Sequence, residues 1–180
     1  MTAAYDDLLA AIPRASWFAA LGARLEDSER GDLMAYLDGL GLKPASVACV
    51  ADWAAAERIA KDPDWDPAWW SAEEAMRHAL LAAAEAALGE TAAMDRLGAV
   101  IQAAHDATIG PAAMAAARAG VADQALIRAA AGAATQACYQ AAVALLAGAL
   151  TDDHPFRLKL RLFQAGRWPL GIVRGSAYIF

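Results

Sequence analysis

The chain of 180 residues lacks any apolar run long enough to cross a membrane as a helix. Its longest apolar run is Ala141–Leu150, whereas a spanning helix needs about 18 or more such residues. The first residues, Met-Thr-Ala-Ala-Tyr-Asp-Asp, contain no basic region followed by an apolar core, so no signal peptide is predicted. No membrane partner is expected.

Cysteine is also scarce, because only Cys49 and Cys138 are present. Two isolated cysteines exclude a disulfide-rich scaffold and a zinc ribbon. Both lie in apolar segments predicted to be helical, where a free cysteine behaves as a small hydrophobic residue. We therefore expect both thiols to be reduced and buried, and the protein to be cytoplasmic.

The chain has none of the short motifs that mark common catalytic or cofactor sites: no nucleophile elbow, phosphate loop, dinucleotide fingerprint or His-Glu-x-x-His. Its single Gly-x-Gly, Gly39–Gly41, follows a predicted helix and not a strand. No cofactor and no metal site are predicted. The formal net charge of −6 would repel a phosphate backbone, so no nucleic-acid partner is expected.

Alanine is the residue present in excess, at 52 of 180 positions, and only two of these follow residue 150. Alanine and leucine are strong helix formers, and β-branched residues are few before residue 150. The run from 122 to 149 is nearly all small and apolar, which predicts a central, buried helix. Helices are predicted over residues 3–12, 14–22, 28–38, 44–61, 71–88 (with a Ser71–Glu74 capping box), 91–109, a short stretch ending at Ala119, and 122–149.

The pattern changes after Asp153. Basic residues and leucines alternate from 157 to 162, which is the period of a half-buried strand, and 170–173 and 177–180 read as two further strands. The predicted fold is mainly α: an alanine-rich helical bundle of about seven to eight helices with a C-terminal two- to three-stranded β-meander. Residues 1–153 form the bundle and 154–180 a small basic β appendage, within one compact domain.

Charge is divided in the same way, because residues 154–180 contain five basic residues and no acidic ones. Arg157, Lys159 and Arg161 alternate along the first predicted strand and would form one basic face. That face has three possible roles. It faces solvent on one side of the sheet, docks on the acidic helices of the same chain, or binds phosphates or an acidic partner.

Trp65, Trp69 and Trp70 gather beside an acidic loop that starts at Asp62. Large rings in an alanine-rich chain can fill gaps in the core. Tryptophan is also enriched at protein–protein hot spots, and aromatic rings beside acids can enclose a cationic ligand. All three roles remain open for this cluster.

His105 shares a predicted helical stripe with Leu97, Ile101 and Thr108, which would place its imidazole on the inward face. A buried histidine needs a hydrogen-bond partner on at least one ring nitrogen. It is either a satisfied core residue or a group with an acid–base or ligand-binding role.

Two functions are compatible with these features. The first is a non-enzymatic interaction, adaptor or accessory module of a bacterial system, which binds a protein partner or a second copy through a terminal edge strand. The second is a small-molecule-binding protein or enzyme with a pocket around His105. The residue types that suit a contact surface lie near the C-terminal strands: Arg167, Trp168, Tyr178 and Phe180.

Overall fold

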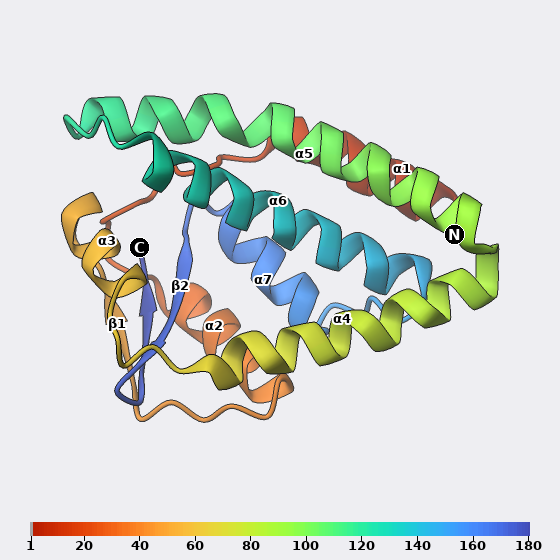
Figure 1. Ribbon diagram of the computed structural model, residues 1–180, viewed down its shortest axis with the longest axis horizontal. Coiled ribbons are helices and arrows are strands. Elements are labelled where there is room, and N and C mark those ends of the chain that lie inside the picture. Colours follow the sequence, from red (N-terminus) through yellow and green to blue (C-terminus); the bar gives the residue numbers. More distant parts are fainter. Residues whose placement is uncertain (1) are drawn as a thin grey trace.

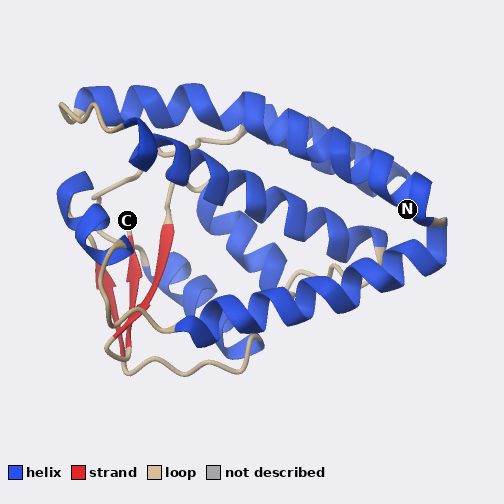
Figure 2. Ribbon diagram, viewed as in Figure 1, coloured by secondary structure: helices blue, strands red, loops and turns tan. Residues whose placement is uncertain are grey.

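A computed structural model describes residues 2–180 of the chain (Figure 1). Within these residues the fold is mainly α, with 66% helix, 7 α-helices and a small 3-strand sheet, as predicted (Figure 2). The elements in chain order are α1 (Thr2–Ala11), the 3₁₀ helix η1 (Ile12–Arg14), α2 (Asp27–Gly39), β1 (Ser46–Cys49), α3 (Trp53–Ala60), α4 (Pro67–Leu88), α5 (Glu90–Arg118), α6 (Gln124–Leu146), α7 (Pro155–Gln164), β2 (Pro169–Val173) and β3 (Ser176–Ile179).

Helix α6 is the centre of the molecule and contacts α1, α4, α5 and α7. Its buried positions are mainly alanine, and such small side chains let neighbouring helices pack closely on all sides. Helices α4 and α5 meet at Gly89 and diverge on either side of α6 (Figure 1). The predicted central helix over 122–149 is thus confirmed, and α6 is partly uncovered where α4 and α5 separate.

Helix α5 corrects the prediction of two helices separated at Gly110–Pro111. It is one helix, and Pro111 lies inside it. Proline removes one helical hydrogen bond, but the buried stripe of Ala104, Thr108, Ala112 and Ala116 continues past it at four-residue spacing. Packing against α6 therefore outweighs the local helix-breaking tendency.

Three other predicted helices were wrong in part. Of residues 14–22, the first ends η1 and residues 15–22 form turns and irregular backbone. Of the helix predicted over 44–61, the first part is strand β1, and α3 begins only after Asp52, whose side chain accepts a hydrogen bond from the Ala55 amide. Helix α4 begins at Pro67, not at Ser71, because Asp66 caps it and proline suits the first turn.

The largest correction concerns residues 157–162, which are helical and not a strand. They belong to α7, where Pro155 occupies the first turn and His154 is the N-cap. The alternation of leucine and basic residues suggested a strand, but Lys159 is buried together with the leucines on either side of it. The basic face predicted for Arg157, Lys159 and Arg161 therefore does not form.

The predicted C-terminal β element is present as the antiparallel pair β2–β3, and β1 adds a third strand beside β3, so the strand order is β1-β3-β2. Strand β3 pairs in parallel with β1 and antiparallel with β2, which confirms strands near 170–173 and 177–180 but adds residues 46–49. Trp65 bridges to Val173 at the outer side of β2. The last strand is therefore central and has no free edge.

The two cysteines differ in environment. Cys138 is buried on α6, and burial raises the pKa of its thiol to about 12. Cys49 is exposed on β1, so its predicted place in a buried helix was wrong. Among residues 2–180, no helix combines the length and the apolar character needed to cross a membrane.

Candidate functional site: a tryptophan-lined pocket over a buried ion pair

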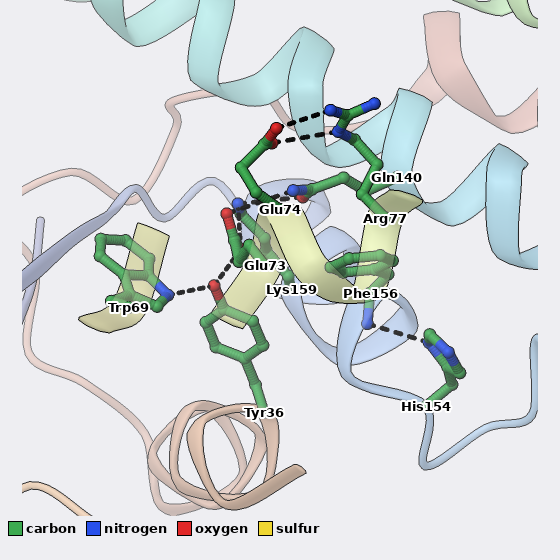
Figure 3. Close-up of polar contacts among 9 residues, drawn as sticks. All are labelled: Tyr36, Trp69, Glu73, Glu74, Arg77, Gln140, His154, Phe156 and Lys159. Carbon is green, nitrogen blue, oxygen red and sulfur yellow. Dashed lines mark hydrogen bonds and ion pairs between the residues drawn. The ribbon is translucent and has the colours of Figure 1, made fainter. Parts of the chain in front are cut away.

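Four polar side chains from four helices meet inside the molecule (Figure 3). Glu73 of α4 pairs with Lys159 of α7, and their side chains are only 5% and 7% exposed. Carboxylate oxygen Oε1 accepts from Lys159 Nζ at 2.5 Å and from the Tyr36 hydroxyl of α2. The Gln140 amide of α6 donates to Glu73 Oε2 at 3.2 Å, and its oxygen accepts from Lys159 at 3.0 Å.

The charges in this network sum to zero. Glu73 accepts from three donors, as an ionised carboxylate can, and Lys159 supplies the compensating charge. Burial raises the pKa of Tyr36 well above 10, and the negative charge of Glu73 raises it further, so the phenol stays neutral. A buried ion pair of this kind is tolerated because its partners satisfy one another.

Lys159 retains one donor that this network does not use. An ammonium group has three N–H donors, and the two acceptors found among the described residues are Glu73 and Gln140. The Nζ atom also lies 5.7 Å from the centre of the Trp69 ring, within the range of a cation–π contact. The Lys159 side chain, which carries this unused donor, also lines a cavity.

That cavity has a volume of about 360 Å³ and is walled largely by tryptophan. A volume of this order, mostly apolar walls and a few polar groups are typical of small-molecule sites. The main lining residues are Trp65, Trp69, Trp70 and Trp168, with Glu73, Lys159 and Gln136 as the polar groups. We refer to this cavity as the tryptophan pocket.

A bulge in β2 shapes one wall of the pocket. The pairing with β3 shifts between Pro169 and Gly171, and Pro169 and Leu170 line the cavity. Gly171 has φ of 145°, and a Cβ atom added there would lie 2.2 Å from the Trp65 indole nitrogen. A glycine is therefore required for Trp65 to approach the strand this closely.

A second concavity of about 630 Å³ adjoins the first, between α4, α5 and α6. It shares Trp70, Gly132 and Gln136 with the tryptophan pocket. Its other lining residues include Met94, Leu97, Ile101, His105, Arg77 and Tyr139. We call this second concavity the α4–α5 groove.

His105 is exposed at this groove and is not on the inward face, so that prediction was wrong. The buried stripe of α5 passes through Leu97, Ala104 and Thr108, and His105 is about 100° around the helix from Ala104. The predicted stripe shared Leu97 and Thr108 with the buried one. Between them, the buried positions are Val100 and Ala104, each one residue before the predicted Ile101 and His105.

The predicted tryptophan cluster is assembled, since all three members line the same pocket. Trp69 is 7% exposed, Trp65 is half-buried and Trp70 is 54% exposed. Trp168 also joins the pocket, and its ring packs on Trp53 at 6.1 Å between ring centres. The pocket wall therefore combines two buried rings, Trp69 and Trp168, with the rings of Trp65 and Trp70, which reach solvent.

The other residues predicted as a contact surface are mostly interior. Arg167 is 4% exposed, bonds both oxygens of Glu29, and donates to main-chain carbonyls. Phe180 is 3% exposed and packs edge-on against Trp53, whereas Tyr178 is half-buried. These side chains hold the C-terminal segment to the rest of the molecule.

The basic residues dock largely on acidic groups of the same chain, which was one of the alternatives. Arg161 donates two hydrogen bonds to Asp32, and Arg174 donates to Asp64 at 2.8 Å. For Glu29, burial tends to raise the pKa of the carboxyl, but the bonds from Arg167 and from the Glu26 amide lower it overall. These cations are therefore not available as a shared phosphate-binding surface.

The central pair Glu73–Lys159 was not predicted, and neither was the role of Tyr36 and Gln140. One sequence signal was present, because Gln140 is the lone amide in the otherwise apolar stretch after Tyr139. A polar residue in a helix buried on all sides implies a partner. Within residues 2–180, no three side chains among His, Cys, Asp and Glu lie close enough together to hold a metal ion.

Comparison of the chain with protein-family models, with curated protein sequences and with solved structures gave no match.

Proposed function

We propose that this protein binds a small uncharged molecule with a flat apolar body and one hydrogen-bond acceptor in the tryptophan pocket. Two observations carry the proposal: four tryptophans wall a cavity that Lys159 also lines, and Lys159 has one donor that Glu73 and Gln140 do not use. The rings supply apolar, flat contact area, and the ammonium supplies one directed polar contact.

The ligand is uncharged because the network below it is already neutral. A carboxylate near Lys159 would also approach Glu73, whose charge would repel it. A cation would approach Glu73 but would also meet Lys159. A carbonyl or ether oxygen can accept from Lys159 without disturbing the pair.

The alternative of a protein-interaction module has less support. It required a free terminal strand and exposed side chains at the C-terminal end. Strand β3 is instead central in the sheet, and Arg167, Trp168 and Phe180 are buried. Small-molecule binding is therefore the function that the geometry favours.

The test uses three small aromatic probes that differ at one position: acetophenone, ethylbenzene and benzoate. Binding is measured by calorimetry and by quenching of tryptophan fluorescence. One hydrogen bond contributes about 0.5–1.5 kcal/mol, so acetophenone should bind about 2–10-fold more tightly than ethylbenzene. Benzoate should bind more weakly than acetophenone.

The double variant Glu73→Gln/Lys159→Met is the matched control. It replaces the buried pair without leaving either charge alone, so its fold is expected to persist and is checked by circular dichroism. It should bind ethylbenzene as the natural chain does and lose the preference for acetophenone. Absence of binding by every probe, or a preference retained in the double variant, contradicts the proposal.

A further inference from the structure

We infer that the ligand extends beyond Trp70 into the α4–α5 groove, and that it is an aromatic compound carrying an uncharged aliphatic chain. This inference rests on the proposed function. It assigns the aromatic end to the tryptophan pocket and the chain to the groove.

The two concavities adjoin along α6. Trp70, Gly132 and Gln136 line both, so the two concavities lie one side chain apart at most. Helices α4 and α5 diverge on either side of α6 at this place (Figure 1). From Met94 to His105 the wall formed by α5 is about 16 Å long, at about 1.5 Å per helical residue.

The groove presents apolar side chains to solvent. Met94 is 51% exposed and Ile101 42%, while Leu97 is buried beneath them at 1%. Trp70 contributes a further exposed ring at the junction. A flexible aliphatic chain suits such walls, because methionine adapts its shape to irregular apolar partners.

The charged groups of the groove are also neutralised in pairs. Arg77 donates to both oxygens of Glu74, at 3.0 and 2.6 Å (Figure 3). The bonds from Arg77 lower the pKa of Glu74, which keeps this carboxyl ionised and the pair complete. Gln102, at the rim, donates to Asp106. Among the described acidic and arginine side chains that line the groove, none is left unpaired to bind an ionic tail.

Two glycines keep the groove open. Gly98 on α5 and Gly132 on α6 line it, and a Cβ atom added at either would meet no atom within 4 Å. Neither has a positive φ that would require glycine. Glycine is a poor helix former, so its use here leaves space beside the helices that another residue would fill.

The experiment compares acetophenone with its 4-ethyl, 4-butyl and 4-hexyl derivatives. In these probes the carbonyl faces Lys159 and the chain leaves the ring on the opposite side. Burying a methylene in an apolar site that stays open on one side should lower the dissociation constant by about two- to threefold. The affinity of the hexyl derivative should therefore greatly exceed that of acetophenone.

The variant Gly98→Leu fills the groove and should bring the ratio of the acetophenone and hexyl dissociation constants close to one. Gly31→Leu is its matched control, because Gly31 is exposed within α2, with open space beside it and outside both cavities. The control should retain the full ratio. Both changes remove a helical glycine, so both variants are expected to fold.

Each outcome distinguishes the two proposals. If no probe binds, the proposed function fails and the inference fails with it. If acetophenone binds but the chain length has no effect, the chain points into solvent and the inference alone is overturned. The inference is likewise overturned if Gly98→Leu retains the gain in affinity with chain length.

Discussion

Residues 155–180 and helix α5 are of similar length but are built in different ways. In the C-terminal segment most residues are buried, and its core positions are large, such as Phe156, Leu160 and Phe163. In α5 one narrow stripe is buried and consists mainly of alanine, while residues such as Met94 and Ile101 reach solvent.

The two regions are stabilised in different ways. The C-terminal segment depends on large apolar side chains and on cations paired with acids elsewhere in the chain, such as Lys159 with Glu73. Helix α5 depends on close approach to α6 through small residues. The tryptophan pocket borders the C-terminal segment, and the α4–α5 groove borders α5.

The largest effect is expected for Lys159→Met. This change leaves the Glu73 carboxylate buried without its cation, which costs about 3–5 kcal/mol. Urea unfolding followed by circular dichroism measures the loss. The double variant Glu73→Gln/Lys159→Met should recover most of it, and a double variant as unstable as the single one would show that the pair is not the cause.

Leu160→Ala tests the dependence of the C-terminal segment on large side chains. Leu160 is fully buried, so the change should cost about 2–5 kcal/mol of unfolding free energy. Ile101→Ala on α5 is the counterpart and should stay within about 0.5 kcal/mol, because Ile101 is 42% exposed. Similar losses for the two variants would remove the contrast between the regions.

Ala104→Leu tests the converse in α5. Ala104 is fully buried on the face that packs against α6, so a larger side chain there should cost about 1–3 kcal/mol. Ala99→Leu, at an exposed position of the same helix, should have little effect. Thermal unfolding of both variants measures the difference, and equal stability would mean that α5 is not closely packed.

The smallest effect concerns the start of α7. His154 Nδ1 accepts a hydrogen bond from the Phe156 amide at 3.1 Å, and burial lowers the pKa of His154 below 6.5. The unfolded chain therefore binds more protons below that pH, and stability falls as the pH drops through the folded-state pKa. His154→Asn retains a capping acceptor that does not titrate.

In that variant the decline in stability between about pH 7 and 5 should be smaller by about 1 kcal/mol, the value of a typical cap. Unfolding midpoints at several pH values give the measurement. An unchanged pH dependence would assign the decline to other groups.

The sequence was sufficient for the parts of the fold that local patterns determine. The small apolar run that became α6 and the strands around Arg174–Gly175 were predicted because composition and turn residues mark them directly. Helix α7 was not predicted, because alternating basic residues and leucines indicate a strand only when the basic residues all face solvent. Lys159 is instead buried.

The candidate site was predictable only in part. The tryptophans were found because three of them are close in sequence, and the pocket does contain them. The pair Glu73–Lys159 joins residues 86 positions apart, and no local pattern links them. The prediction assigned His105 to the buried face of its helix, but the buried residue is Ala104, one position earlier. One residue turns a helix by about 100°, which is enough to move a side chain from the core to the surface.

The parallel pairing of β1 with β3 has a consequence for the order in which the protein folds. The hydroxyls of Ser46 and Ser176 lie 2.8 Å apart, although 130 positions separate them in the chain. Closing so long a loop is slow, whereas α4, α5 and α6 follow one another and can pack early. The wall formed by β2 and the ion pair beneath it then come last, so a chain still on the ribosome has helices before it has a pocket.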